Sequence, residues 1–372
     1  MSATSSTAPL RVTAASGSYD VHVGVAGLAP LAVAARAHSR SGRCVVVTDT
    51  NVARAWRSSV EAKLAESGLQ QTWFELAPGE ATKTIASADS LYTSLIEGGF
   101  SRADVLVAVG GGVVGDLSGF VAATYHRGMP WVHAATSLLA QVDSSIGGKV
   151  AVDHRLGKNL IGAFHPPRAV VSDVRMLQTL PLRERWNGLA EVVKSALIAD
   201  VPLLELLETN LEALGNATAA EGLLLDVIRR SAAIKVRVVS EDEREEGVRL
   251  HLNFGHTLGH ALELATGFGP LLHGEAIVIG MRVAVELSRE LGTLNPEEAA
   301  RALALLGRFP APPVSSPAPS VEALRAALGR DKKSVGGKVR FVVLEGLGKA
   351  GVVGALPPEL LERGLRMLVE PV

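Results

Sequence analysis

The chain has 372 residues, of which 47% are hydrophobic and 4% aromatic, and its 37 basic and 38 acidic side chains leave a formal charge of -1. This balance argues against wholesale binding to nucleic acid or to an anionic membrane, because both need an excess of basic side chains. At this length two domains are expected rather than one.

The first residues of the chain, MSATSSTAP, contain no basic residue and no apolar run. Residues 1–10 are therefore expected to form a disordered tail rather than a signal peptide. No stretch of 18 apolar residues occurs, so we expect a soluble, cytoplasmic protein. The single cysteine, Cys44, excludes an internal disulfide and a thiolate metal site.

The first half of the chain alternates between two kinds of pattern. Residues 11–25 alternate apolar and polar side chains around a Gly-Ser break, which predicts a hairpin. Helices are then predicted at 28–38, 51–67, 84–98 and 113–124, and strands at 43–49, 71–77, 104–109 and 131–135. This order predicts a parallel sheet covered by helices, the architecture of many nucleotide-binding domains.

Beyond about residue 180, apolar residues recur every three or four positions, which predicts helices at 188–200, 202–214, 219–240, 251–266 and 274–292. The segment FPAPPVSSPAPS (309–320) predicts a linker. A short helix at 321–329 and a hairpin made of VRFVVLEG and KAGVVGA follow. The fold class is therefore α/β, with a Rossmann-like parallel-sheet domain at 11–180 followed by a mostly α-helical, metal-binding domain at 181–372.

Two strand-to-helix junctions are candidates for a dinucleotide site. The run from Gly110 to Asp116 satisfies G-x-G-x-x-G, whose glycines let the backbone approach a pyrophosphate at a helix start. The acidic residue expected about twenty positions later is missing, but Asp49 ends an earlier strand and can bind a ribose instead. At the second junction, Glu80 and Lys83 can join the same site. The alternatives are tight strand–helix packing and an ordinary helix start.

Two further segments carry two lysines, a carboxylate and an amide among glycines. Asp143 and Lys149 flank one of them, and Lys158 and Asn159 lie in the other. Both look too glycine-rich for regular structure, which predicts a functional loop. Two ammonium groups and an amide suit a phosphate, a carboxylate or a polyol, and the alternative is a solvated loop.

The polar residues of the second half suggest a metal site. Glu191 and Lys194 share one face of a helix whose neighbours are apolar, so the carboxylate needs a cation or metal partner rather than a surface ion pair. His256 and His260 are four residues apart, and His273 follows closely. Thr257 replaces the glutamate of H-E-x-x-H, which argues against a zinc protease. One Glu and two His around an ion leave positions open for a substrate oxygen.

Seven motifs in order resemble the 3-dehydroquinate synthases, within the wider family of sugar-phosphate cyclases. They span about residues 43 to 345 and read GGGVVGDLSGFVAATYHRG, QVDSSIGGKVAV, GKNLIGAFHPP, GLAEVVKSALI, LNFGHTLGHALE, HGEA and GRDKKSVGGKVRFVVL. The family converts 3-deoxy-D-arabino-heptulosonate 7-phosphate to 3-dehydroquinate and phosphate in the shikimate pathway. It uses NAD⁺ without net consumption, together with a divalent metal such as Zn²⁺ or Co²⁺.

The resemblance also implies roles for individual residues. The metal ligands would be Glu191, His256 and His273. NAD would be held by Asp49, Asn51, Glu80, Lys83, Gly111, Gly112, Gly115, Asp116, Thr136, Ser137, Lys149, Lys158 and Thr179. Substrate contacts and catalysis would come from Asp143, Lys149, Lys158, Asn159, Lys194, Lys235, Arg249, Asn253, His260 and one of Lys332 and Lys333. Arg127 would reach the substrate phosphate from a neighbouring subunit, which implies a homodimer.

Two departures from the family pattern leave this ligand set intact. The chain has Ala135-Thr136-Ser137 where Pro-Thr-Thr is common, and Asp153 where an Asn is common. Two rival functions stay open. A metal-dependent alcohol or glycerol dehydrogenase has a similar architecture but needs few phosphate ligands. A sister cyclase, similar to 2-epi-5-epi-valiolone synthase, acts on a different sugar phosphate.

Overall fold

The computed structural model describes residues 8–25, 27–312, 318–330, 334–335 and 338–369. The chain forms two compact units. The first unit consists of Met1–Pro181 and Ala220–Glu243, and the second of Leu182–Ala219 and Arg244–Val372. Helix α7 (Glu221–Glu241) therefore belongs with the first unit, although two helices of the second unit precede it in the chain.

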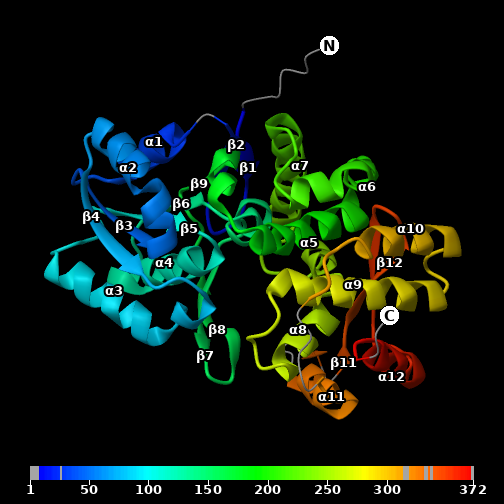
Figure 1. Cartoon of the computed structure of the whole chain (residues 1–372). Coiled ribbons are helices and arrows are strands. Elements are labelled where there is room, and N and C mark those ends of the chain that lie inside the picture. The colour runs from blue at the N-terminus through cyan, green and yellow to red at the C-terminus, as the bar shows by residue number, and fades with distance from the viewer. Residues whose placement is uncertain (1–7, 26, 313–317, 331–333, 336–337, 370–372) are drawn as a thin grey trace. The chain divides into compact units, whose positions relative to one another are not determined.

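The first unit is built on a seven-stranded sheet, seen in Figure 1. Its strands run in the order β1-β2-β9-β6-β5-β3-β4, and only β1 is antiparallel to its neighbour. The strands are β1 (Leu10–Val12), β2 (Tyr19–Gly24), β3 (Arg43–Asp49), β4 (Gln70–Leu76), β5 (Val105–Gly110), β6 (Trp131–Ala135) and β9 (Ala169–Asp173). The predicted hairpin and parallel sheet are confirmed, and β9 is a strand that the sequence did not reveal.

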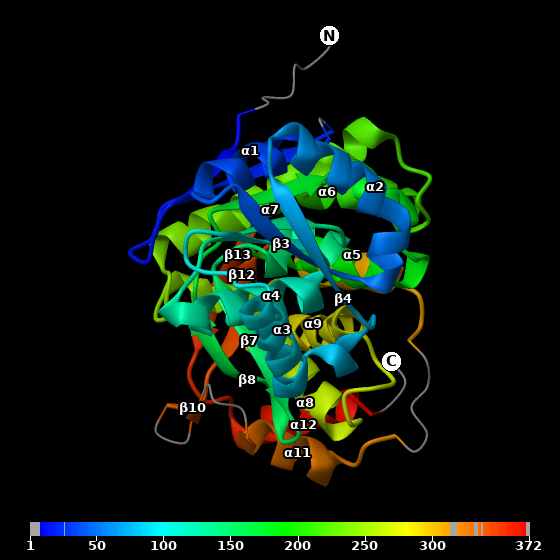
Figure 2. The same ribbon diagram turned by 90° about the vertical axis from the view of Figure 1, so that its left-hand side faces the viewer.

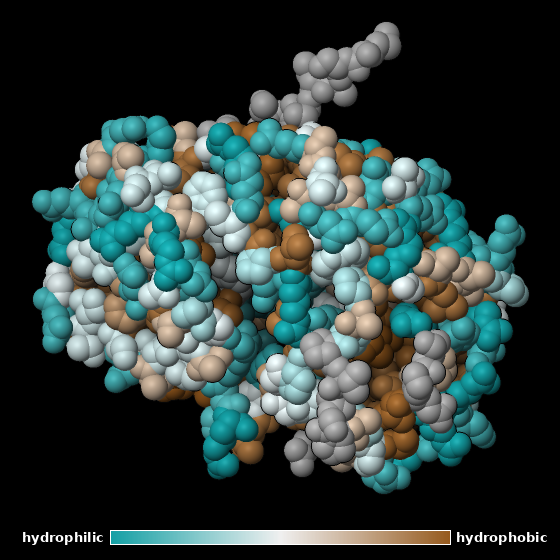
Figure 3. All heavy atoms as spheres, viewed as in Figure 1, coloured by the Kyte–Doolittle hydropathy of each residue, from teal (hydrophilic) through white to brown (hydrophobic). Residues whose placement is uncertain are grey.

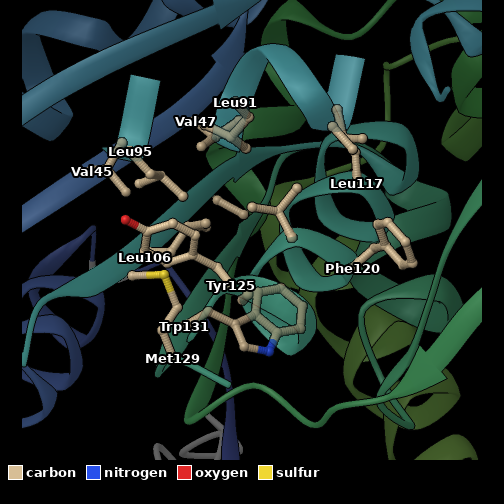
Figure 4. Packing of buried hydrophobic residues seen from close by; sticks show 14 of the residues in the cluster. Val45, Val47, Leu91, Leu95, Leu106, Leu117, Phe120, Tyr125, Met129 and Trp131 are labelled. Atoms are coloured by element: carbon tan, nitrogen blue, oxygen red, sulfur yellow. The ribbon is translucent and has the colours of Figure 1, made fainter. Parts of the chain in front are cut away.

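Helices cover both faces of this sheet, as Figure 2 shows. They are α1 (Ala29–His38), α2 (Thr50–Glu66), α3 (Ile85–Glu97) and α4 (Gly112–Thr124). Strand β3 alternates between the two layers. Val45 and Val47 pack with Leu91 of α3 and Leu117 of α4 (Figure 4), whereas Val46 belongs to the cluster formed with α1 and α2. A strand buried on both faces explains the continuous apolar run at 44–47.

The glycine-rich segments between residues 140 and 164 correct an expectation of irregular structure. Residues Ala140–Ser144 form a π-helix, and β7 (Lys149–His154) pairs antiparallel with β8 (Gly157–Phe164). The apolar residues between the glycines outweigh the low strand propensity of glycine, because Val150 and Val152 are buried in the hydrophobic cluster that includes Leu117 of α4. Asp143 thus lies in a π-helix, and Lys149, Lys158 and Asn159 lie in a hairpin.

The second unit is mostly helical, as predicted, and α9 packs against α5, α8, α10, α12 and β12. Its helices are α5 (Leu182–Ala199), α6 (Val201–Gly215), α8 (His256–Ala265), α9 (His273–Glu290), α10 (Pro296–Leu306), α11 (Val321–Arg330) and α12 (Pro358–Met367). Its strands are β10 (Ser334–Val335), β11 (Lys338–Val339), β12 (Phe341–Gly346) and β13 (Lys349–Val353), and the last two form the predicted terminal hairpin.

Two details of the second unit differ from the expectation. The helix predicted at 251–266 is interrupted: Val248–Asn253 is a 3₁₀ helix, and α8 starts only at His256. Gly255 separates the two with a φ of 78°, a left-handed conformation that ends one helix before the next begins. Helices α10 and α12 were also not predicted, because the apolar patterns between residues 292 and 309 and after the hairpin are short.

The face shown in Figure 3 carries many hydrophilic side chains, with hydrophobic ones in smaller groups among them. Within the described residues, the helices are too short or too polar to cross a membrane.

Candidate functional site

The second unit brings the three predicted metal ligands together. Oε1 of Glu191 lies 3.5 Å from Nε2 of His256 and 3.6 Å from Nε2 of His273. An ion bound tetrahedrally at 2.0 to 2.1 Å would hold its ligand atoms about 3.4 Å apart. The three ligand atoms all lie within 4.8 Å of one another. The predicted cluster of Glu191, His256 and His273 therefore has the dimensions of a divalent metal site.

The chemistry of this donor set also fits a cation. Glu191 is 1% exposed, and neither of its oxygens accepts a hydrogen bond of good geometry from a described residue. Its Oε2 contacts the ammonium group of Lys194, which is equally buried, while its Oε1 faces the two imidazoles. Burial alone would raise the pKa of Glu191, but the charges of Lys194 and His273 outweigh it and lower the pKa to about 2. The carboxylate is therefore ionised and can bind a metal through Oε1.

Local structure explains why these side chains meet. Asn187, one helical turn before Glu191 on α5, accepts a hydrogen bond of 2.6 Å through Oδ1 from the backbone N–H of Gly274 on α9. A Cβ at Gly274 would lie 2.1 Å from the carbonyl oxygen of Asn187, so only glycine allows this approach of the two helices. The segment Leu272-His273-Gly274-Glu275 thus holds His273 against the helix that carries Glu191.

His260 lies beside this cluster. Its ring centroid is 5.2 Å from that of His256 and 5.8 Å from that of His273. Glu263, also on α8, places Oε2 3.3 Å from Nδ1 of His273. The sequence interpretation missed Glu263, although His256, His260 and Glu263 are spaced as i, i+4 and i+7 on one helix face.

In the first unit, most residues expected to bind NAD lie at one edge of the sheet. Asp49 ends β3, Gly110 ends β5, and Thr136 follows β6. The carboxyl ends of parallel strands share one edge. From β3 the chain continues to β4 on one side and then returns to β5 on the other side, so a topological switch point lies between β3 and β5. Dinucleotides bind parallel sheets at such a point. The first turn of α4, with Gly111 as its N-cap, begins there.

Several of these candidates already have partners within the protein. Oδ1 of Asp49 accepts hydrogen bonds from the backbone N–H groups of Asn51 and Val52, and so caps α2. The backbone N–H of Thr136 donates to the carbonyl of Gly110, Oγ of Ser137 accepts from the N–H of Ala140, and Oγ1 of Thr179 accepts from Nε1 of Trp56.

A buried lysine links both junctions to the β7–β8 hairpin. Nζ of Lys83 donates hydrogen bonds to Oδ2 of Asp116 and Oδ1 of Asn159, although it is only 3% exposed. Burial alone would lower the pKa of Lys83, but Asp116 and Glu80 outweigh it and raise the pKa. Burial raises the pKa of Asp116 and of Glu80, and nearby lysines only partly offset that effect. This group forms a compact charged cluster around one ammonium.

A second ion pair lies in the same unit. Nζ of Lys235, on α7, donates a hydrogen bond of 2.6 Å to Oδ1 of Asp143 in the π-helix. Single-turn π-helices occur often at functional sites, because the extra residue redirects a side chain. The grouping of α7 with the first unit therefore brings together two residues that are 92 positions apart.

The remaining predicted residues are distributed over both units. Arg249 and Asn253 belong to the 3₁₀ helix before α8; Arg249 is buried, and Nδ2 of Asn253 donates to Oε1 of Glu245. Arg127 lies in an exposed turn of the first unit, where it has a φ of 64° and His126 a φ of 50°. Lys332 and Lys333 lie outside the described residues.

Comparison with known protein families shows which family this chain belongs to. The family models of the N-terminal and C-terminal parts of 3-dehydroquinate synthase match residues 73–187 and 188–334. The chain belongs to the 3-dehydroquinate synthase family. A 3-dehydroquinate synthase from Pelobacter propionicus is 44% identical over 355 residues, 95% of this chain and 97% of that protein. One from Azotobacter vinelandii is 44% identical over 98% of this chain and 99% of that protein.

A solved structure of an enzyme other than a 3-dehydroquinate synthase has the same fold. The 2-epi-5-epi-valiolone synthase from Streptomyces hygroscopicus, solved with NAD⁺ and Zn²⁺ bound, has a TM-score of 0.84 and 30% identity. The match covers 95% of this chain and 97% of that one. The α/β fold class and the resemblance to 3-dehydroquinate synthases are thus confirmed.

Proposed function

We propose that this chain is an enzyme that converts 3-deoxy-D-arabino-heptulosonate 7-phosphate to 3-dehydroquinate and phosphate, a phosphate-eliminating lyase of the shikimate pathway. The observation that carries the proposal is the cluster of Glu191, His256 and His273, found in a chain that belongs to the 3-dehydroquinate synthase family. A cytoplasmic location fits this biosynthetic role.

We assign the cofactors to different units. A divalent metal, Zn²⁺ or Co²⁺, would be held by Glu191, His256 and His273 in the second unit. NAD would be held in the first unit by the strand ends at Asp49, Gly110 and Thr136, together with Glu80 and Lys83. NAD⁺ would supply a reversible hydride acceptor for a ring hydroxyl carbon, and the metal would supply a Lewis acid for the oxygen of that hydroxyl group. Residues 11–180 and 181–372 would thus form NAD-binding and metal-binding domains, with α7 added to the first.

Polar and charged side chains of the hairpin, together with the Asp143–Lys235 ion pair, would bind and orient the substrate. Asn159 and Lys158 on β8, with Lys149 on β7, present the donors that a phosphate or polyol requires. Asp143 would accept hydrogen bonds from substrate hydroxyl groups while Lys235 holds its carboxylate in place, an assignment that their 2.6 Å contact supports.

The second unit would recognise the carboxylate and the reacting oxygen. Arg249 is only 2% exposed, and a guanidinium shielded from water makes strong, charge-assisted hydrogen bonds to a carboxylate. Arg249 and Asn253, with one of Lys332 and Lys333, would bind the substrate carboxylate. Lys194 and His260, which flank the metal cluster, would hold or move protons at the reacting oxygen of the substrate.

We further propose that the chain works as a homodimer in which Arg127 reaches the partner's substrate phosphate. Two consecutive non-glycine residues with positive φ, His126 and Arg127, store strain in an exposed turn, a feature that clusters at functional sites. Strand β8 supplies an apolar surface for a partner, because Leu160, Ile161 and Phe164 are 39%, 36% and 43% exposed.

A sister cyclase function is the second candidate, because a 2-epi-5-epi-valiolone synthase shares 30% identity and a TM-score of 0.84. The substrates differ at two carbons: the heptulosonate carries a carboxylate at C1, where sedoheptulose 7-phosphate has a hydroxymethyl group, and it lacks the hydroxyl at C3. The experiment compares kcat/KM for 3-deoxy-D-arabino-heptulosonate 7-phosphate and sedoheptulose 7-phosphate, with NAD⁺ and Co²⁺ present. We expect a preference of up to ~10⁴ for the acid, by analogy with sites built around one recognised polar group. Similar values would favour the sister cyclase.

A further inference from the structure

Glu263 is a buried carboxylate for which the proposed reaction has no task. It lies on α8, is 3% exposed, and places Oε2 3.3 Å from Nδ1 of His273 on α9. Moving an ionised carboxylate out of water costs several kcal/mol, so such a group persists only where a cationic or hydrogen-bonding partner compensates. The imidazole of His273 is one such partner.

The two histidines of the metal cluster are oriented in the same way by different groups. In both, Nε2 faces Oε1 of Glu191. Nδ1 of His256 faces the backbone carbonyl of Phe254 at 3.2 Å, whereas Nδ1 of His273 faces the carboxylate of Glu263. A histidine that ligates through Nε2 must carry its proton on Nδ1, and an acceptor on that side fixes both the tautomer and the ring direction.

We propose that Glu263 is a positioning residue for the metal: it holds His273 in the Nδ1–H form with Nε2 turned toward Glu191, and its charge makes the imidazole a stronger ligand. This inference rests on the metal site of the proposed function, but not on the proposed reaction. Phe254 can give His256 only a neutral carbonyl, so the carboxylate gives His273 the stronger support of the two.

A competing arrangement uses Glu263 as a ligand. Atoms of His260, Glu263 and His273 also lie within 4.8 Å of one another, a second group that can hold an ion. His273 is common to both groups, and its two nitrogens point in opposite directions. If both groups were filled, His273 would have to bridge two ions and lose its Nδ1 proton. The two arrangements differ in stoichiometry, so a metal titration separates them.

The test compares Co²⁺ binding to the metal-free full-length chain and to three variants. Glu263→Ala removes the acceptor, and Glu263→Gln keeps the volume and a carbonyl oxygen but loses the charge. Glu290→Gln is the matched control, because Glu290 is a largely buried carboxylate on the same helix as His273, paired with Arg363 at 3.0 Å. It lies 17 residues along α9, or about 25 Å. The readouts are the Kd from competition with a chelator, the number of ions bound and the visible spectrum of bound Co²⁺.

We expect one Co²⁺ per wild-type chain, a Kd that rises about 10- to 100-fold in Glu263→Ala and less in Glu263→Gln. The Co²⁺ spectrum should change in both Glu263 variants and stay unchanged in Glu290→Gln. If Glu263→Ala does not fold, as judged by circular dichroism of the metal-free chain, Glu263→Gln decides the question.

Two results would overturn the inference. One is an unchanged Kd and spectrum in the Glu263 variants. The other is two ions per wild-type chain and one in Glu263→Ala, which would make Glu263 a ligand. A wild-type chain that binds Co²⁺ as expected but does not convert the heptulosonate phosphate would contradict the proposed function and leave this inference standing.

Discussion

Oε1 of Glu191 lies 3.5 Å from Nε2 of His256, a separation suited to two ligands of one tetrahedral ion. The two residues come from different helices of the second unit, and a third helix adds His273 at 3.6 Å from the same oxygen. Because Oε2 faces the ammonium of Lys194, the carboxylate presents a single oxygen to the ion.

Removal of the metal should abolish turnover. Glu191→Gln keeps the shape of the side chain but leaves two imidazoles and a neutral amide, a weaker donor set for Zn²⁺ or Co²⁺. We expect kcat to fall at least about 10²-fold in Glu191→Gln and in His256→Ala, since a Lewis acid supplies several kcal/mol of charge stabilisation. Metal content by atomic absorption and phosphate release check this. A chelator should have the same effect, reversed by Zn²⁺ or Co²⁺, whereas full activity in metal-free protein would refute the assignment.

The ion pair of Lys83 and Asp116 should stabilise the first unit only while both partners are present. Lys83→Met leaves the Asp116 carboxylate without its ammonium partner, and breaking a buried pair in this way costs about 3 kcal/mol or more. The double variant with Asp116→Asn should recover part of the loss, because it removes the uncompensated charge. Urea unfolding followed by circular dichroism gives the free energy of unfolding. Equal stability of the Lys83→Met variant and the double variant would contradict the expected recovery.

His133 should lower the free energy of unfolding as the pH decreases. It is 1% exposed on β6, its Nε2 contacts the carbonyl of Gly110 at 3.1 Å, and burial lowers its pKa from 6.5 to about 4. As pH falls, the unfolded chain binds a proton near pH 6.5 but the folded chain only near pH 4. The folded state therefore loses about 3 kcal/mol between pH 7 and pH 4 from this residue.

The measurement is the free energy of unfolding at pH 7 and at pH 4.5 in wild type and in His133→Gln. The variant cannot take up a proton at this position, so its stability should depend less steeply on pH. His154→Gln, at an exposed histidine of the same unit, is the control and should follow the wild type. An equally steep dependence in His133→Gln and wild type would rule out a contribution from His133.

Arg127 should act on the partner's substrate, which a mixing experiment can detect. Arg127→Ala and His256→Ala are each expected to be inactive alone. In a mixed dimer, the site with an intact metal cluster receives Arg127 from the other subunit. Random exchange of subunits should then restore about a quarter of the wild-type activity. No recovery, with mixed dimers demonstrated by tagging, would place Arg127 outside the partner's site.

Arg249 should bind the carboxylate of the substrate. Arg249→Ala should lower kcat/KM for the heptulosonate phosphate by about 10²-fold or more, because a charged hydrogen-bonded partner is lost in a buried position. The same variant should change kcat/KM for sedoheptulose 7-phosphate little. Measured values that fall equally for both compounds would show that Arg249 does not distinguish them.

The sequence predicted the parts of the fold that follow from local periodicity. Strand β3 is predicted with its observed bounds because the apolar run at 44–47 lies between the polar residues Arg43 and Thr48. The polar residues of the second half indicate a site with one Glu and two His, and the family resemblance selects Glu191, His256 and His273, whose ligand atoms lie within 4.8 Å of one another. The contact of Lys235 with Asp143 depends on how α7 packs, and nothing in the local pattern reveals that. The strands of the β7–β8 hairpin were also hidden, because glycine signals a loop in the sequence even where flanking valines bury a strand.

The most direct test of the central claim counts products formed per NAD⁺. The purified chain is loaded with Co²⁺, given 3-deoxy-D-arabino-heptulosonate 7-phosphate in large excess over NAD⁺, and assayed for phosphate, 3-dehydroquinate and NADH. The account predicts many equivalents of phosphate and dehydroquinate per NAD⁺ in equal amounts, with no NADH that grows with product. One NADH per product, or phosphate without dehydroquinate, would contradict it.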